Sequence, residues 1–204
     1  VYPASALNTG MLEWADQVLV ATNLQRHSMN DFMRQQRGFG PEPEDGDKVI
    51  CLRNYWEWGN LTNGDPLVNG TIGTLHDPKY SHINVPFYAY EKGKINILAA
   101  KFESDLGENF GHINMDPRIM KGGESELEWR DKYKLNKLKP RIGDVVPKEF
   151  TYGYAITCHK AQGSEWDNVL VLEEKFPYPA VEHARWLYTA ATRAAEKLVI
   201  VTKD

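Results

Sequence analysis

The sequence predicts an α/β fold in which a parallel sheet flanked by helices is interrupted by an inserted β domain. Short apolar runs near both ends of the chain alternate with helical patterns, which is typical of a parallel sheet covered by helices. The middle third shows short β-like segments separated by turn residues. We therefore expect one α/β domain formed by residues 1–44 and 149–204, with residues 45–148 as an inserted β-barrel domain that carries a basic segment.

The first part of the α/β domain is predicted to be a strand, a turn and a helix. The apolar run 18–21 is followed by Thr22 and Asn23, and then by Met29 and Met33 at helical spacing. Prolines and glycines in residues 38–46 can continue neither a helix nor a strand. This stretch marks the boundary of the insertion.

The insertion is predicted to be a small antiparallel barrel. Its expected strands are 48–53, 71–75, 85–90 and 95–102. They are separated by hairpin signals at Asn63-Gly64, at Asn69-Gly70 and at residues 92–94.

The last third is predicted to return to the parallel sheet. Residues 150–157 and 169–172 have the apolar, β-branched character of buried parallel strands. A helix is expected over 184–195 and a final strand over 198–201. This order of strand, helix and strand completes the α/β domain.

Composition and charge exclude several classes of protein. The chain has 204 residues, 42% hydrophobic and 25% charged, and no apolar stretch approaches the roughly 18 residues that span a bilayer. Cys51 and Cys158 are too few for a disulfide framework and no signal peptide opens the chain, so we expect a cytoplasmic protein with no membrane partner.

The net charge of −4 argues against bulk attraction to nucleic acid. The one basic segment runs from Arg130 to Arg141 and contains a single acid, Asp131. It is either a solvated helix face or a strip that faces phosphates.

Two segments carry residues suited to phosphate and nucleic-acid chemistry. In residues 154–169 a strand ends at Thr157, and the polar turn that follows holds His159, Lys160 and Gln162. These side chains offer donors to a nucleic-acid backbone and an amide that can sense a terminal phosphate. The alternative is an ordinary loop with capping residues.

The second segment, residues 185–194, places Arg193 in a helical pattern rich in small residues. A rigidly held arginine can present its planar fork to a transferring γ-phosphoryl group. The alternative is a salt bridge at the end of the helix.

Together these segments resemble motifs V and VI of superfamily 1 DNA helicases with a UvrD-like C-terminal domain, in the RecD-like and Dda-like branch of bacteria and their phages. Tyr154–Val169 is similar to the pattern Tyr-Ala-x-Thr-x-His-Lys-x-Gln-Gly-Ser-x-x-x-x-Val, and Leu187–Ala194 to Leu-Tyr-x-Ala-x-Thr-Arg-Ala. Ala21–Asn30 resembles motif IV. Residues 46–50 and 69–74 resemble an inserted Src-homology-3-like barrel.

The resemblance implies a RecA-like second motor lobe of the P-loop NTPase type, and a role for each matching residue. Arg193, as the arginine finger, and Gln162 would be catalytic. Nucleotide contacts would come from Gly163, Glu165 and Arg193, and DNA contacts from Thr157, His159, Asn23 and Arg26. Val20-Ala21 replaces the Tyr-Arg pair of UvrD-like enzymes, so the base-stacking role of that pair is not transferred.

No phosphate-cradling P-loop is present, because Gly93-Lys94 is followed by Ile95 and lacks the upstream glycine. ATP and Mg²⁺ would therefore be held mainly by an N-terminal RecA-like lobe outside this chain. We expect no metal site here, and residues 170–174 are interpreted as the strand after motif V rather than as magnesium ligands. The fragment alone is expected to be catalytically silent.

The expected function is the C-terminal portion of an ATP-dependent DNA helicase that moves 5′ to 3′ on single-stranded DNA, in replication or repair. One alternative is a non-catalytic nucleic-acid-binding scaffold with a degenerate motor fold. Another is the helicase part of an exonuclease complex. In the insertion, Tyr55, Trp56 and Trp58 are either base-stacking surfaces or packing within a barrel loop.

Overall fold

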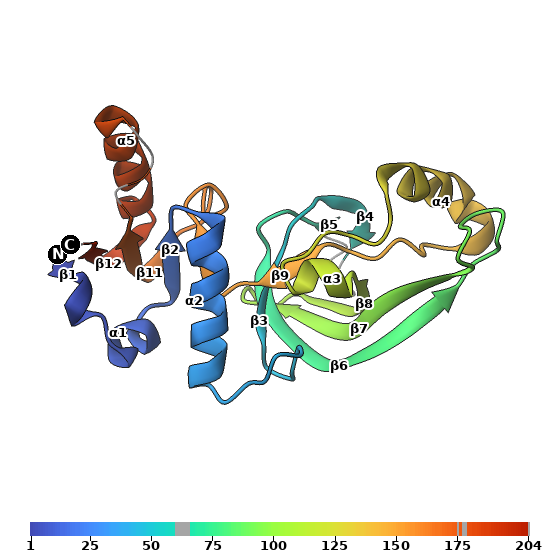
Figure 1. Cartoon of the computed structure of the whole chain (residues 1–204), viewed down its shortest axis with the longest axis horizontal. Coiled ribbons are helices and arrows are strands. Elements are labelled where there is room, and N and C mark those ends of the chain that lie inside the picture. Colours follow the sequence, from blue (N-terminus) through green and yellow to red (C-terminus); the bar gives the residue numbers. More distant parts are fainter. Residues whose placement is uncertain (60–65, 175, 177–178, 204) are drawn as a thin grey trace. The chain divides into compact units, whose positions relative to one another are not determined.

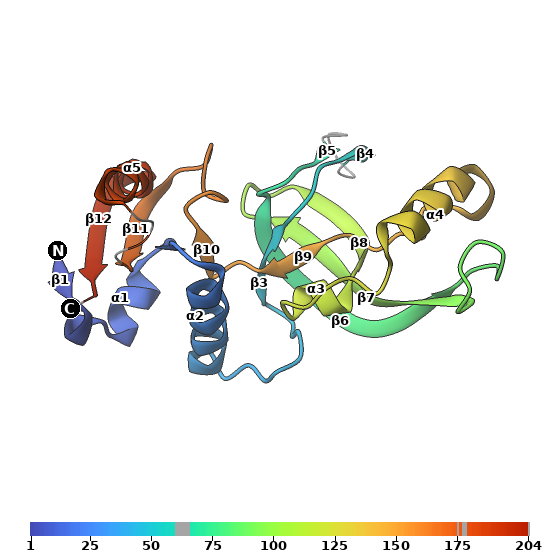
Figure 2. The same ribbon diagram turned by 45° about the horizontal axis from the view of Figure 1, so that its top comes forward.

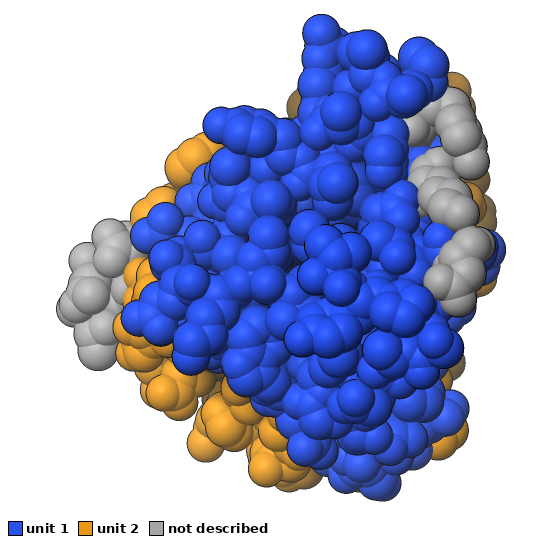
Figure 3. Space-filling model, turned by 90° about the vertical axis from the view of Figure 1, so that its left-hand side faces the viewer, with its two compact units in different colours: residues 1–40, 153–204 blue, residues 41–152 orange. Residues whose placement is uncertain are grey.

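The computed structural model describes residues 1–59, 66–174, 176 and 179–203, and the chain divides into two compact units (Figure 3). Unit 1 comprises residues 1–40 and 153–204, and unit 2 comprises residues 41–152. The boundaries expected after residues 44 and 148 both fall inside unit 2. The Asn63-Gly64 turn lies outside the described residues.

Unit 1 is built on a five-stranded sheet with the order β1-β12-β11-β2-β10, in which every pair of neighbours is parallel. The predicted parallel sheet flanked by helices is therefore confirmed. Its elements are β1 (Tyr2–Pro3), the 3₁₀ helix η1 (Ala4–Ala6), α1 (Thr9–Trp14), β2 (Gln17–Val20), α2 (Asn23–Gln36), β10 (Ala155–Thr157), β11 (Trp166–Glu173), α5 (Ala180–Ala191) and β12 (Ala194–Thr202).

The central strands form because their residues are apolar on both faces. Val18, Leu19 and Val20 of β2 are fully buried, as are residues 169–171 of β11. Strands of this kind need helices on both sides. The connections β2–α2–β10 and β11–α5–β12 run in opposite directions across the sheet, so right-handed crossovers place α2 and α5 on opposite faces (Figures 1 and 2).

Unit 2 is a small antiparallel barrel. Its main sheet has the order β8-β7-β6-β3-β9, and a parallel bridge between Met115, at the end of β8, and Lys148, shortly before β9, joins the two edge strands. Its elements are β3 (Lys48–Cys51), β4 (Tyr55–Gly59), β5 (Pro66–Leu67), β6 (Ile72–Asn84), β7 (Lys94–Ser104), β8 (Asn109–Met115), α3 (Pro117–Met120), α4 (Trp129–Ile142) and β9 (Phe150–Tyr152).

The barrel has two apolar centres. The rings of Phe102, Phe110 and Phe150 meet inside it, with centroids 5.7 and 5.1 Å apart in the pairs that Phe102 makes with the other two. A second cluster lies where Leu135 of α4 packs with Ile95 and Ile97 of β7. This cluster fixes α4 against the far end of the β6–β7 hairpin.

Three sequence predictions about elements differ from the structure in pairing, type or bounds. Residues 150–157 are two strands, because β9 pairs antiparallel with β3 in unit 2 and only β10 joins the parallel sheet. Residues 85–90 form a turn that begins at Pro86, and the side chains of Val85, Ala89 and Tyr90 belong to the cluster under α4. The helix expected over 184–195 ends at Ala191, and β12 starts earlier than expected.

No helix within the described ranges is long and apolar enough to cross a membrane. Both cysteines are buried thiols that form no disulfide with each other.

Candidate functional site

The segment 158–165, which carries most of the predicted site residues, runs across unit 1 from the carboxyl ends of the strands to their amino ends. It leaves β10 where Thr157 pairs with Val20, and it enters β11 at Trp166, three residues before Val169 pairs with Gln17. At about 3.3 Å per residue these registers lie about 20 Å apart along the strands. The segment therefore starts at the carboxyl ends of the parallel strands and finishes at their amino ends.

Thr157 and His159 lie at the first end, beside the carboxyl ends of β10 and β2. The carbonyl of Thr157 accepts the backbone N–H groups of Lys160 and Ala161 at 2.8 and 3.1 Å, which forms the turn. Thr157 is buried, whereas His159 is exposed. Of these two predicted DNA contacts, His159 has its side chain available to a ligand.

The second end is joined to Arg193. The guanidinium donates from Nη1 to the Ser164 carbonyl at 3.1 Å, from Nε to the Thr189 carbonyl at 3.2 Å and from Nη2 to Thr192 Oγ1 at 3.2 Å. The backbone N–H of Trp166 donates to the Arg193 carbonyl at 3.0 Å. The segments that resemble motifs V and VI are thus directly hydrogen-bonded to each other.

The sequence pattern predicted Arg193 on the helix. In the structure it lies in the turn between α5 and β12. The acceptors of these three hydrogen bonds are neutral oxygens, and within the described part of the chain Arg193 pairs with no carboxylate. The guanidinium has five N–H groups, so two donors remain after these three bonds. The arrangement can hold a half-buried cation ready for an anion.

Gly163 and Glu165 lie beside this contact. Gly163 has φ +90°, a backbone conformation that favours glycine, and a Cβ there would meet open space. Glu165 is exposed. Glycine is therefore required here by the backbone rather than by crowding.

A cavity of about 160 Å³ lies between the crossing segment and α5. Gln162 and His159 line it from one side, and Trp186 and Thr189 from the other. Burial raises the pKa of the Cys158 thiol, which Arg193 partly offsets, so the thiol in this wall stays protonated at neutral pH. The cavity brings together the predicted catalytic glutamine and the predicted DNA-contacting histidine.

The predicted DNA contacts at the start of α2 have different surroundings. Asn23 is the first residue of α2 and is exposed. Arg26 is half-buried and its Nη2 lies 2.9 Å from Nε2 of His27. Burial lowers the pKa of His27, and the nearby charge of Arg26 lowers it further. The imidazole is therefore neutral and accepts a hydrogen bond from Arg26. Nε of Arg26 has no hydrogen-bond partner among the described residues.

Two positioning residues were missed by the sequence analysis. The side-chain amide of Asn30 donates to the Ala155 carbonyl at 2.8 Å and accepts from the Ala155 N–H at 3.0 Å, which links α2 to β10. Glu174 accepts the Ala21 N–H at 2.8 Å and the Thr22 hydroxyl at 2.7 Å. The only sequence signal was the position of Asn30 in the motif IV pattern.

The residues present suit part of a nucleotide site. Arg193 and Gln162 offer donors to a phosphate, but no cluster of three possible metal ligands occurs in the ranges that the structure describes. The Glu174 carboxylate accepts hydrogen bonds from Ala21 and Thr22, and the Glu173 carboxylate lies 3.0 Å from His183. The donor set therefore fits phosphate oxygens and does not fit Mg²⁺ by itself.

Comparison with known proteins agrees with this arrangement. Residues 152–201 match the model of the UvrD-like helicase C-terminal domain. This segment is similar to the UvrD-like helicase C-terminal domain. It begins at the end of β9 and contains the crossing segment, α5 and nearly all of β12, so it includes both segments that the sequence analysis assigned to helicase motifs.

The fold of the chain is also that of helicase motor domains. A Pif1 helicase from Bacteroides, solved with ADP-AlF3 and single-stranded DNA, aligns with a TM-score of 0.51 and 16% identity over 92% of this chain. Pif1 helicase from Candida albicans aligns with a TM-score of 0.52 and 17% identity over 91%. The predicted RecA-like lobe is thereby confirmed as the fold of unit 1.

This chain spans 40% and 44% of those two solved chains. An uncharacterized protein of Methanocaldococcus jannaschii is 40% identical over 116 residues, which are 56% of this chain and 10% of that protein.

Proposed function

We propose that this chain is the second motor lobe, with its inserted barrel, of an ATP-dependent DNA helicase. The observation that carries the proposal is the hydrogen bond between Arg193 and the Ser164 carbonyl. This bond connects a cation suited to a γ-phosphate with the segment that leads back to Thr157 and His159 at the carboxyl ends of the strands. Movement of Arg193 is thereby linked to a segment suited to DNA.

In this proposal ATP and Mg²⁺ bind mainly to a first RecA-like lobe outside this chain. A bound triphosphate supplies the phosphoryl group that is transferred to water. Arg193 exchanges neutral oxygen partners for a charged one, which is favourable because hydrogen bonds to ionised acceptors are stronger. Gln162 and Gly163 would lie at the phosphate, and Glu165 near the nucleotide sugar. The fragment alone is silent because it lacks the phosphate cradle.

The DNA side of the proposal uses Thr157 and His159 of the crossing segment, with Asn23 and Arg26 as further contacts. Since the crossing segment joins both sides, exchange of the Arg193 bonds would shift the grip on single-stranded DNA. Movement from 5′ to 3′ and membership of the RecD-like branch rest on the sequence motifs. The Pif1 helicases of similar fold, one of them solved with single-stranded DNA, support DNA as the substrate.

The decisive test is Arg193→Ala in the full-length protein. Steady-state ATP hydrolysis with saturating single-stranded DNA should fall by about 10³-fold or more, because an arginine finger acts on charge that develops in the transition state. Nucleotide affinity should change little. Arg193→Lys should recover little of the activity, because lysine lacks the planar fork.

Arg118→Ala is the matched control, since Arg118 is an exposed arginine of unit 2, and it should leave turnover unchanged. Circular dichroism of each variant separates a catalytic loss from unfolding. Full turnover by folded Arg193→Ala would contradict the finger role of Arg193, whereas a parent protein that hydrolyses no ATP would support the non-catalytic scaffold instead.

A further inference from the structure

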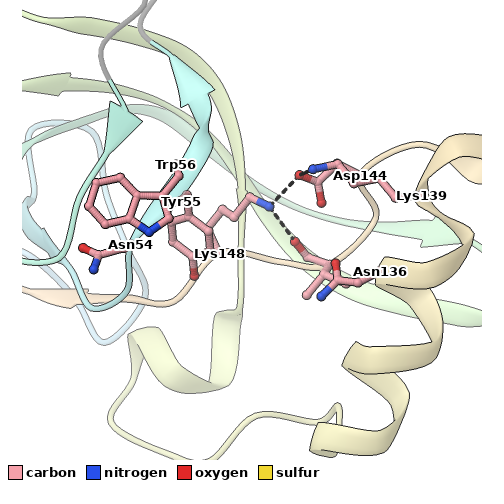
Figure 4. A pocket seen from close by; sticks show the side chains of 8 residues that line it. Asn54, Tyr55, Trp56, Asn136, Lys139, Asp144 and Lys148 are labelled. Atoms are coloured by element: carbon pink, nitrogen blue, oxygen red, sulfur yellow. Dashed lines mark hydrogen bonds and ion pairs between the residues drawn. The ribbon is translucent and has the colours of Figure 1, made fainter.

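A groove of about 500 Å³ in unit 2 brings together two features that are far apart in the sequence (Figure 4). Asn54, Tyr55 and Trp56 line it from β4 and the residue before β4, and Asn136 and Lys139 line it from α4. Asp144, Val146 and Lys148 complete the wall. The aromatic cluster and the basic segment of the sequence therefore face one cavity.

The two aromatic residues of the groove differ in exposure. The hydroxyl of Tyr55 accepts the Glu149 N–H at 2.7 Å, and burial raises the pKa of Tyr55, so this ring belongs to the barrel wall. Trp56 is 70% exposed. An indole this exposed at the edge of a groove offers a flat apolar surface to a ligand.

The charge of the groove is positive. Lys139 and Lys148 share one carboxylate, Asp144, at 3.2 and 2.8 Å from Oδ2. Burial alone would raise the pKa of Asp144, but the two lysines hold it below its usual value, so the carboxylate is ionised at neutral pH. The charged residues that line the groove are two lysines and one aspartate, a formal sum of +1, and this sign suits an anion.

Further exposed aromatics continue from the groove along α4. Tyr133 and Trp129 lie three and seven residues before Asn136, which places all three on one helix face. Their exposed fractions are 54% and 72%, and their ring centroids are 6.4 Å apart. The ammonium of Lys137 lies 4.6 Å from the centroid of the Tyr133 ring. A row of rings with cations suits a polymer that carries several bases rather than one small molecule.

We propose that this groove and the adjoining face of α4 bind single-stranded DNA, with a base stacked on Trp56 and a phosphate at Lys139. Stacking on aromatic rings together with cations along the backbone is the chemistry of sequence-tolerant single-strand binding. The proposal rests on DNA being the substrate proposed above. It adds a contact made entirely within unit 2, with residues that play no part in the nucleotide chemistry.

The test measures binding of fluorescein-labelled (dT)16 to the 204-residue chain by anisotropy at several salt concentrations. Trp56→Ala should weaken binding about 10-fold, and Trp56→Phe, which keeps an aromatic face, should stay within about 3-fold of the parent. Tyr88→Ala is the matched control, because Tyr88 is an equally exposed aromatic of unit 2 outside the groove, and it should bind like the parent.

The charge contact has its own readout. Lys139→Ala should lower the slope of log affinity against log salt by about 0.7, the amount expected for one phosphate contact on a single strand. Lys101→Ala, at an exposed lysine outside the groove, should leave the slope unchanged.

A photo-crosslink reports the stacking directly. An oligonucleotide with 5-iododeoxyuridine should crosslink to the peptide that contains Trp56, as mapped by mass spectrometry. Absence of this crosslink while the oligonucleotide is bound, or parent affinity in Trp56→Ala, overturns the inference. So does competition by free dTMP at the nucleotide concentration of the oligonucleotide, since the groove would then be a mononucleotide site.

Failure of this inference is distinguishable from failure of the proposed function. If His159→Ala weakens binding and Trp56→Ala does not, the groove is not a DNA site and the motor assignment stands. If only Trp56→Ala weakens binding, the groove binds DNA and the assignment of His159 fails.

Discussion

At the scale of single residues, the structure separates groups that stand close together in the sequence. His159 and Arg193 belong to opposite ends of a segment that crosses the sheet, although His159 lies only five residues before Ser164, which Arg193 contacts. His159 and Arg193 can therefore contact different ligands. This separation supports a DNA end at His159 and a nucleotide end at Arg193, whereas Gln162 shares a cavity with His159 and its nucleotide role rests on the motif.

The division predicts different kinetic effects for His159→Ala and Gln162→Ala in the full-length enzyme. Loss of the imidazole should weaken single-strand binding about 10- to 150-fold, the range expected for one hydrogen bond to a charged group, and spare basal ATP hydrolysis. Gln162→Ala should lower basal hydrolysis itself. Hydrolysis rates measured with and without DNA, together with DNA affinities, check both.

Thr157→Val is a companion variant, since Thr157 is buried and its backbone carbonyl forms the turn. If its hydroxyl contacts DNA, as the motif implies, this variant should behave like His159→Ala. Equal loss of basal and stimulated rates in all three variants would contradict a divided segment.

The sequence predicted the chemical types of the site but not its contacts. The site residues of 154–169 and 187–194 could be recognised from the sequence, because a hydroxyl, an imidazole, an amide and an arginine occur there at fixed spacing. The bond from Arg193 to Ser164 depends on β11 and β12 being neighbours in register, with Trp166 opposite Ala194. Long-range register leaves no local signal, and for the same reason Glu174 was not predicted to bind the start of α2.

At the scale of elements, α4 shows how tertiary packing overrides sequence pattern. Its basic residues were noticed as a charged strip, whereas its apolar side is set by few residues, including Leu135 in the cluster with Ile95 and Ile97. The strand β6 ends before Pro86, and Ala89 and Tyr90 in the turn that follows pack under α4. The full length of β6 was missed because its second half, residues 76–84, is mostly polar and exposed.

One carboxylate ties α4 to the barrel. Glu149 accepts from Lys132 of α4 at 2.8 Å and from Nε of Arg53 at 2.9 Å. Burial alone would raise the pKa of Glu149, but Arg53 and Lys132 hold it below its usual value. The Glu149 side chain is 14% exposed and that of Lys132 25%, so this pair is less screened than the one with the largely exposed Arg53.

Glu149→Gln should therefore destabilise unit 2 by about 1–2 kcal/mol, less than for a fully buried pair. Urea unfolding followed by circular dichroism measures the loss. Glu91→Gln, at an exposed glutamate of the same unit, should change stability by less than about 0.5 kcal/mol. An equal effect of the two changes would show that Glu149 does not hold α4.

The pH dependence has a defined sign. Because the folded-state pKa of Glu149 is lowered, its contribution is fully present above the unfolded-state value near 4.5 and is lost as the pH falls through that value towards the folded pKa. The difference in stability between parent and Glu149→Gln should accordingly shrink below about pH 4.5.

At the scale of the whole molecule, the barrel is an insertion whose two ends lie together. Val49 of β3 pairs with Tyr152 of β9, so the chain enters and leaves the barrel on neighbouring strands. In unit 1, the guanidinium of Arg37 lies 4.7 Å from the centroid of the Tyr154 ring, near the other side of both junctions. Each unit therefore brings its own pair of ends close together, as expected of an inserted domain.

Replacing residues 41–152 with a Gly/Ser linker of about eight residues, which reaches up to about 26 Å, should leave unit 1 folded. In the full-length enzyme this deletion should preserve much of the ATPase rate, because Arg193, Gln162 and the crossing segment all lie in unit 1. It should greatly diminish unwinding of a forked duplex with a 5′ tail, because the barrel would brace the strand-separating elements of the first lobe or guide the strand.

The point substitution Trp56→Ala separates the two ways in which the barrel can act. If the barrel contributes only by bracing, Trp56→Ala unwinds at the parent rate and the deletion does not. If it contributes by holding the strand at Trp56 and Lys139, the point substitution reproduces part of the deletion defect, most strongly at high salt, where the remaining phosphate contacts are weakest. Unwinding by the deletion variant at the parent rate, measured on the same forked duplex, would contradict any mechanical role of unit 2 and leave it as a surface for another partner.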